Sequence, residues 1–474
     1  MSDEVLRRGL GLRSVVSTST GLAFAAIEYL AAASLLAYVS GSLAWVSILV
    51  AGGMALLAWG FFSELNGLFP TAAAIRLYMQ RSFDDRVALT VTFSYLTTVV
   101  LVLAADAYIV GAAFTHVTGL PGWVTGLVIA VLLGVAMAAN LRGVQLAARV
   151  QDIATLTVVV ATIVVAGVAL SKHRTPAAIA ADAHRHHGAA AFVQAVALGV
   201  LLYSAFEWVT TSSEEVRRLR DVPRGMVIAL GVLALTCAAV AAAMGRLLSQ
   251  TELDSAYPQL FLGRHAMGQA GYVLMCGITL VTAINTFNSG FITASRFVYA
   301  TAREGSLPRG FARLNDNAVP WLPVVVIGGV ALAASLLVAV TDGWKVLVAT
   351  GAALEAGIYA VAAFCVLRLR RRQPDEERPF RVPAARVLGW VGVVVFGLLA
   401  AAASVSVDDK TNAVPLLIIV LVAGAAAAYV LVGLPRVRAA EAARRAAQGP
   451  RRRRPAPPTV ASQEAAPTAS KETA

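Results

Sequence analysis

Charged residues are scarce in this sequence. Asp, Glu, Lys and Arg make up 14% of the 474 residues, against 58% hydrophobic residues and a mean hydropathy of +0.72. A soluble protein of this length would carry about 25% charged residues and divide into several domains. The long Ala-, Val- and Leu-rich runs suit lipid instead, because a helix needs roughly 20 apolar residues to cross the hydrocarbon core. They are too continuously apolar for an outer-membrane barrel, so we predict an all-α polytopic membrane protein.

Cysteines and catalytic motifs are also rare. Cys237, Cys276 and Cys365 lie inside apolar stretches without metal-ligand spacing, which is typical of small buried side chains. The sequence contains no nucleophile elbow, no HExxH pair, no phosphate-binding loop and no soluble catalytic domain. We therefore predict that the protein is not an enzyme and uses neither a metal nor a cofactor.

Twelve apolar stretches are long enough to be membrane-spanning helices. They cover residues 14–39, 42–66, 88–116, 122–141, 150–171, 190–212, 225–248, 270–301, 320–341, 345–367, 386–407 and 412–434. If the N-terminus is cytoplasmic, 32 of the 39 Lys and Arg residues fall on the cytoplasmic side and 7 on the other, as the positive-inside rule predicts. The net charge of +12 thus indicates topology rather than nucleic-acid binding. We expect a multi-pass protein of the cytoplasmic membrane with both termini in the cytoplasm.

The sequence divides into three parts. Residues 1–13 form a short cytoplasmic tail, residues 14–434 contain the spans, and residues 435–474 form a basic cytoplasmic tail. The last part is rich in Ala, Arg and Pro and cannot bury a core, so we expect it to be disordered. Its run Arg451–Arg454 could contact anionic membrane lipid, at about 1 kcal/mol per arginine.

Four polar segments interrupt the hydrophobic pattern in a fixed order. They are SELNGLFPTAAAIRLY after the second span, YSAFEWVTTSSEEVRRLRDVPRG at the sixth, NSGFITASRFVYATAREGSLP at the eighth, and RPFRVP before the eleventh. Each motif alone is weak. Together, at these spans, they resemble the amino acid–polyamine–organocation (APC) superfamily of permeases over about residues 10–434.

This resemblance implies a five-plus-five inverted repeat of the leucine-transporter type. The repeats would cover about residues 14–171 and 190–367, with two peripheral helices at about 386–434. The first helix of each repeat, spans 1 and 6, would break inside the membrane and expose backbone groups to substrate and ion. Two polar clusters in the sequence agree with such breaks, at residues 17–21 and 204–211. The implied function is secondary transport of amino acids or related amines, by symport or exchange coupled to H⁺ or Na⁺.

The candidate site residues come from five spans. Those expected to bind substrate are Thr20, Gly21, Ala25, Ala26, Ile27, Glu28, Asp106, Tyr203, Ser204, Ala205, Phe206, Glu207 and Glu355. The family's Gly-Ser-Gly cradle for a carboxylate aligns with residues 25–27, and Tyr203 aligns with an aromatic lid, although ordinary packing explains it equally well. Asn288 and Ser289 would supply oxygen to a coupled ion. The family's lysine of span five aligns with Val158, which leaves the coupling ion open.

Four acids lie within apolar runs: Glu28, Asp106, Glu207 and Glu355. Each costs about 2.5–3.5 kcal/mol at a helix centre, so each needs a partner, a water-filled cavity or a proton. They disfavour anionic cargo and favour amines. Glu28 could hold a second amine of a cationic substrate, carry the coupling proton, or be structural. The alternatives to an amino acid permease are a polyamine or cationic amine transporter and a non-transporting nutrient sensor.

The charge distribution predicts that both termini are cytoplasmic. In a cysteine-free variant carrying Asp3→Cys or Val460→Cys, a membrane-impermeant maleimide should label the new thiol only after the cells are permeabilised. Labelling at either position in intact cells would refute this topology.

Overall fold

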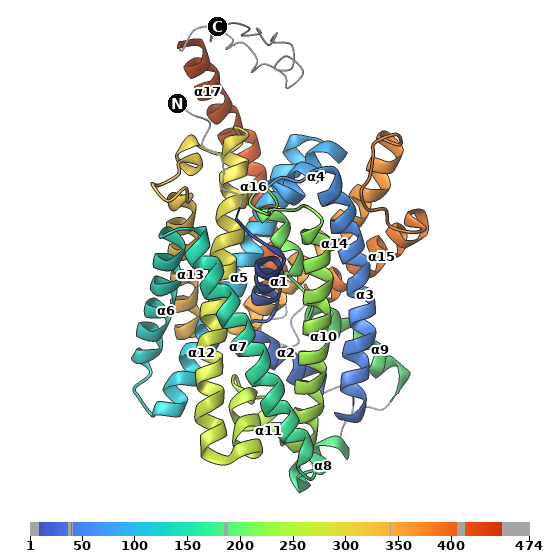
Figure 1. Cartoon of the computed structure of the whole chain (residues 1–474), viewed down its shortest axis with the longest axis vertical. Coiled ribbons are helices and arrows are strands. Elements are labelled where there is room, and N and C mark those ends of the chain that lie inside the picture. Colours follow the sequence, from blue (N-terminus) through green and yellow to red (C-terminus); the bar gives the residue numbers. More distant parts are fainter. Residues whose placement is uncertain are drawn as a thin grey trace, which may run out of the picture.

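The computed structural model describes residues 9–36, 39, 41–183, 188–341, 343–404 and 413–447. Within these residues every secondary-structure element is a helix, and most of the helices lie side by side along the long axis of the molecule (Figure 1). In this described part of the chain, eleven helices are long and apolar enough to cross a membrane, or up to twelve if one bent pair near the N-terminus is a single span. The prediction of an all-α polytopic membrane protein is therefore confirmed.

The long helices correspond to the predicted spans. They are the bent pair α1 (Leu12–Ala23) and α2 (Ile27–Leu35), then α3 (Gly41–Leu68), α5 (Asp85–Thr118), α6 (Trp123–Leu141), α7 (Val144–Ser171), α9 (Ala189–Leu201) with the 3₁₀ helix η1 (Phe206–Ser212), α10 (Asp221–Leu247), α12 (Pro258–Arg303), α13 (Trp321–Thr341), α14 (Trp344–Arg372), α15 (Ala385–Ala403) and α16 (Val414–Ala428). Short helices connect them: α4 (Ala74–Ser82), α8 (Pro176–Ala183), α11 (Gln250–Leu253) and η2 (Arg309–Ala312).

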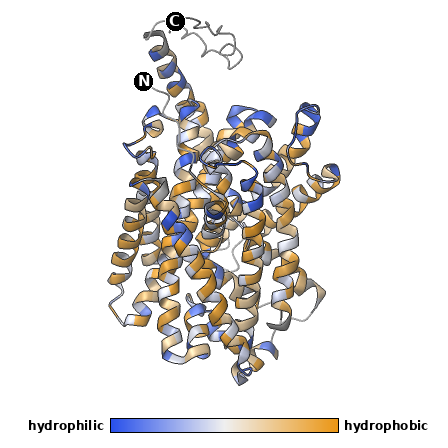
Figure 2. Ribbon diagram, viewed as in Figure 1, coloured by the Kyte–Doolittle hydropathy of each residue, from blue (hydrophilic) through white to orange (hydrophobic). Residues whose placement is uncertain are grey.

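The sides of the bundle are hydrophobic, and hydrophilic residues gather toward its two ends (Figure 2). Val131 on α6, Val160 on α7 and Leu398 on α15 are each more than half exposed, at 53%, 51% and 67%. Large apolar side chains on the outside are what a helix bundle presents to lipid. The bent pair is surrounded instead: α1 packs against α7, α10, α12 and η1. Polar groups on α1 are therefore shielded from lipid by other helices.

The C-terminal segment differs from expectation. Residues 435–474 were expected to be disordered, but Leu434–Ala447 forms α17, which continues α16 through the π-helical turn η3 (Tyr429–Gly433). Composition alone missed the ion pairs that hold this helix: Arg438 pairs with Asp85, and Glu441 with Arg309 at 2.7 Å. Over residues 435–447 the structure therefore has a helix where disorder was expected. Residues 448–474 lie outside the described part of the chain.

A tight backbone contact shapes the N-terminal part of α12. Met267 and Gly268 have non-helical backbone angles, and Gly268 has a φ of +65°. The segments on either side of this kink approach each other at Gly263 and Gly271. A Cβ atom on either glycine would lie far inside van der Waals contact with the other residue's backbone. Only glycine allows this approach.

We therefore predict that Gly271→Ala destabilises the protein by about 1–3 kcal/mol, the usual cost of overpacking. A melting curve of the purified protein should show a transition several degrees lower. Gly277→Ala, on the same helix, is the matched control, because a Cβ atom at Gly277 would meet nothing within 4 Å. If the two variants melt at the same temperature, the close approach of Gly263 and Gly271 does not constrain this helix as predicted.

Candidate functional site

The first break lies between α1 and α2, whose axes differ by 61°. Backbone amides at the start of a helix have no partner within that helix. Here the N–H groups of Ala26 and Ile27 both donate to Oδ1 of Asp106, at 2.5 and 3.3 Å. Asp106 lies on α5 and is fully buried. A side chain from another helix thus completes the broken span.

Two buried carboxyl groups meet at this break. Glu28, in the first turn of α2, is close enough to Asp106 to interact with it electrostatically. Oε2 of Glu28 and Oδ2 of Asp106 are buried, and neither has a hydrogen-bond partner among the described residues. No Lys, Arg or His of the described chain forms an ion pair with either acid. Two such acids need a proton or a cation, because an isolated buried charge is costly.

The second break follows α9, where Ala205 adopts a left-handed backbone with a φ of +69°. Its N–H donates to Oε1 of Glu355 at 3.3 Å and to the hydroxyl oxygen of Tyr359 at 3.1 Å. The Tyr359 hydroxyl donates to Oε2 of Glu207 at 2.7 Å, and the Tyr95 hydroxyl donates to Oε1 of Glu207 at 3.0 Å. Oε2 of Glu355 has no partner among the described residues. At this break too, an acid on a neighbouring helix accepts from a freed amide.

The two breaks are joined directly. The hydroxyl of Ser19 on α1 donates to the backbone carbonyl of Phe206 on η1 at 2.5 Å. Most of the predicted substrate residues therefore fall into two connected groups. One holds Ala26, Ile27, Glu28 and Asp106, and the other holds Ala205, Phe206, Glu207 and Glu355. Thr20, Gly21 and Ala25 are buried at the same bend, and the hydroxyl of Thr20 has no partner among the described residues.

Tyr203 and Ser204 lie at the bend before η1. The Tyr203 hydroxyl donates to the backbone carbonyl of Ile48 on α3 at 2.8 Å. Its ring lies against Gly52, where a Cβ atom would come within 2.8 Å of the tyrosine oxygen. Ser204 donates its N–H to Leu201 in the last turn of α9. Tyr203 thus packs against α3, and its role as a substrate lid stays a prediction.

Two carbonyls in the middle of α1, those of Ser17 and Thr18, face neutral donors on α7 and α12. Nε2 of Gln151 donates to the Ser17 carbonyl at 3.2 Å and also to Oδ1 of Asn285. Ser289 donates to the Thr18 carbonyl at 3.3 Å. Asn288 donates to the Ala147 carbonyl and to Oε1 of Gln151, at 2.7 and 3.0 Å, and accepts from Asn140. Asn288 and Ser289 therefore act as donors here, and their predicted role as oxygen ligands of an ion stays a prediction.

Sequence reasoning missed three residues of this site: Tyr95, Gln151 and Tyr359. Tyr359 follows Glu355 by one helical turn, so the two share a face of α14, and this spacing could have indicated it. Gln151 lies two turns before Val158 on α7, and Val158 itself is buried and apolar. An uncharged amide thus occupies the neighbourhood in which relatives were expected to place a lysine.

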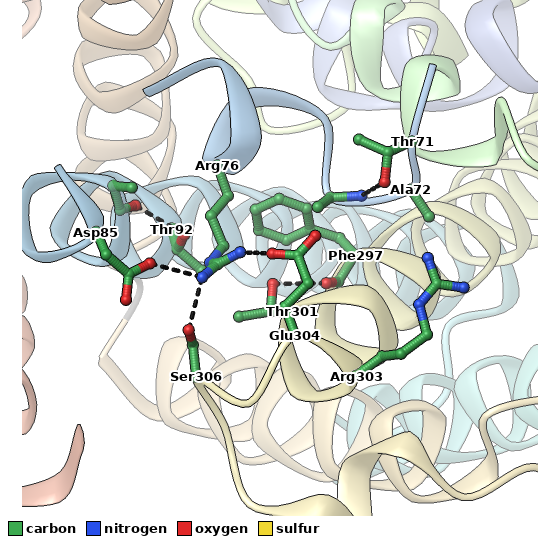
Figure 3. A network of polar contacts seen from close by, with 12 residues as sticks. Thr71, Ala72, Arg76, Asp85, Thr92, Phe297, Thr301, Arg303, Glu304 and Ser306 are labelled. Carbon is green, nitrogen blue, oxygen red and sulfur yellow. Dashed lines mark hydrogen bonds and ion pairs between the residues drawn. The ribbon is translucent and has the colours of Figure 1, made fainter. Parts of the chain in front are cut away.

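Parts of the four sequence motifs contact one another through ion pairs. Those around Arg76 lie at the end of the bundle that holds α4 and α17 (Figure 1). Figure 3 shows Arg76 at the centre of a polar network. Its guanidinium is buried, donates to Asp85 at 2.7 Å and to the Ser306 hydroxyl at 2.6 Å, and pairs with Glu304. Because Arg438 also pairs with Asp85, this network connects α4, α5, α17 and the segment after α12.

Glu214 makes a second connection at the same end. Arg303 donates to both of its oxygens, at 2.9 and 2.6 Å, and the N–H of Ala72 donates at 3.1 Å. Burial raises the pKa of Glu214, but these hydrogen bonds lower the pKa by more than burial raises it, so the pKa lies below the ordinary glutamate value. The contact is therefore present at neutral pH and is lost only as the pH falls through that lowered pKa. Beside it, the fully buried Arg296 donates to Glu215 at 2.8 Å.

A cavity of about 630 Å³ opens toward the opposite end. It is lined by the far half of α5, including Tyr108 and His116, and by Tyr257, Trp344 and Lys345. Asp106 and the other residues of the two breaks are not among the residues that line this cavity. Ion pairs connect the helices at the α4 end of the bundle, and the cavity lies at the other end.

Comparisons with known proteins agree with this geometry. A family model described as "Amino acid permease" matches residues 10–426. An uncharacterized amino acid permease of Bacillus subtilis is 26% identical over 61% of this chain and 70% of that protein. The methylthioribose transporter of the same organism is 23% identical over 72% of this chain and 77% of that protein. An uncharacterized transporter of Mycobacterium bovis is 28% identical over 83% of this chain and 87% of that protein.

The family match covers far more than half of the chain and includes both breaks. Its members carry small molecules across membranes and catalyse no reaction. The chain belongs to the amino acid permease family of the APC superfamily.

Proposed function

We propose that the protein is a secondary active transporter that moves amino acids or related amines across the cytoplasmic membrane by alternating access. The observation that carries this proposal is the pair of broken helices, connected through Ser19 and Phe206 and surrounded by buried acids that form no ion pair with a basic side chain of the described residues. Broken spans at mid-membrane place backbone groups where substrate and ion bind. Lone acids in that position attract a proton or an amine.

The proposal includes the inverted-repeat architecture and cytoplasmic termini. Each half of the chain, residues 14–171 and 190–367, starts with a broken span, which supports a repeat relation. The end with α4 and α17 carries Arg76, Arg303 and Arg438, in agreement with the positive-inside rule. On this reading the cavity faces outward and the ion pairs close the cytoplasmic side.

We further propose that the coupling ion is a proton. The Ser17 and Thr18 carbonyls of α1 already accept from Gln151, Thr155 and Ser289, so these two oxygen atoms are not free to bind a Na⁺ ion. The four buried acids are the other candidate ion-binding groups, and among the described residues Glu28 is the one of the four to which neither a tyrosine hydroxyl nor a backbone amide donates. It can exchange a proton without breaking a hydrogen bond that holds a helix end.

The uptake prediction tests both the function and the role of Glu28. In proteoliposomes, the wild-type protein should accumulate a labelled amine or amino acid when an inward proton gradient is imposed. Glu28→Gln should keep substrate exchange between the two sides but lose gradient-driven accumulation by about tenfold or more. Asp316→Asn, which changes an exposed acid, is the matched control.

Binding without any flux would overturn the transport proposal and favour a sensor. If Glu28→Gln instead weakens binding of cationic substrates and keeps gradient-driven uptake, then Glu28 contacts cargo and is not the proton carrier.

The closed cytoplasmic side generates a second prediction. Arg76→Gln removes the centre of the network in Figure 3 and should open this side. Cys365, which is buried and lies 3.3 Å from Met79 of α4, is a native reporter. With Cys237 and Cys276 replaced by Ser, maleimide labelling of Cys365 in inside-out vesicles should become several times faster.

Arg81→Gln changes an exposed arginine on the same helix and should leave the labelling rate unchanged. Equal rates for the two variants would show that the Arg76 network does not close the cytoplasmic side.

A further inference from the structure

The first break already contains a carboxylate, and the protein supplies it. A half-helix that starts inside a membrane offers its free amides to an anionic group of the cargo. Here the free amides of α2, Ala26 and Ile27, both donate to Asp106. Asp106 is held on α5, a continuous helix, and is fully buried. A cargo carboxylate would therefore find these donors occupied.

The charge around the break also opposes a second anion. Glu28 follows the two amides directly, and its Oε2 is buried and unpartnered among the described residues. Oδ2 of Asp106 is likewise buried and unpartnered, although the Thr286 hydroxyl on α12 lies beside this carboxyl group. No basic residue of the described chain neutralises either acid. These free oxygens can accept hydrogen bonds and attract positive charge, whereas a cargo carboxylate would be repelled.

We propose that Asp106 takes the place of a cargo carboxylate and that the physiological cargo is a small amine without one, such as a decarboxylated amino acid. The two amides hold Oδ1 and stabilise Asp106 as an anion, and Oδ2 receives the ammonium group of the cargo. This inference rests on the proposed transport function and narrows its substrate class. It makes Asp106 the residue that determines specificity.

The test uses pairs of compounds that differ only in the carboxylate: tyramine and tyrosine, agmatine and arginine, cadaverine and lysine, isoamylamine and leucine. Thermal shift of the purified protein and uptake into proteoliposomes are measured for each compound. For at least one pair, the wild-type protein should bind and transport the amine at concentrations about tenfold or more below those needed for the amino acid.

Two variants of Asp106 distinguish the effect of its negative charge from the effect of its hydrogen bonds with the Ala26 and Ile27 amides. Asp106→Ser shortens the side chain and frees the amides, so the amino acid of the preferred pair should gain at least about tenfold in affinity. Asp106→Asn keeps an oxygen acceptor for the amides but removes the charge. It should weaken amine binding without any gain for the amino acid, and because it is nearly isosteric it also shows whether the fold survives.

Each outcome decides the inference. Wild-type protein that transports the amino acids as well as or better than the amines overturns the inference and leaves the transport function intact. An equal loss for amine and amino acid in both variants also overturns it, because Asp106 would then only hold the helix. If no compound binds or moves with the wild-type protein or either variant, the proposed function fails together with the inference.

Discussion

The structure depends on one constraint: a helix that breaks inside a membrane must find partners for the amides that it frees. Water is absent from the hydrocarbon, so the partners have to come from the protein or the cargo. Asp106 meets this need at the first break and Glu355, with Tyr359, at the second. In the mechanism that we propose, Asp106 also receives the ammonium group of the cargo, so stability and function would depend on the same carboxylate.

Sequence alone predicted the spans well because their length and apolar composition are fixed by the bilayer. It also identified Glu28, Asp106, Glu207 and Glu355, since an acid in an apolar run is costly wherever it lies. It could not predict that Asp106 reaches Ala26, because the two residues are 80 positions apart and only helix packing brings them together.

The missed features have physical reasons as well. Gln151 looks interfacial in the sequence, and its contacts with Ser17 and Asn285 depend on how α1 bends. Tyr95 and Tyr359 resemble ordinary packing residues, because their hydroxyl partners are on other helices. The helix α17 was missed because composition reports how little core a segment can bury and says nothing of ion pairs to Asp85 and Arg309.

The pairing of Asp106 with α2 also bears on how the carrier completes its cycle. If the cargo supplied the anion for the helix end, the unloaded protein would expose two unsatisfied amides in the middle of the membrane, and changing its conformation while empty would be slow. With Asp106 in place, the helix end is complete whether or not cargo is bound. If the protein is the transporter that we propose, its empty form can return at little extra cost, and this arrangement would favour net movement down a driving gradient over obligatory one-for-one exchange.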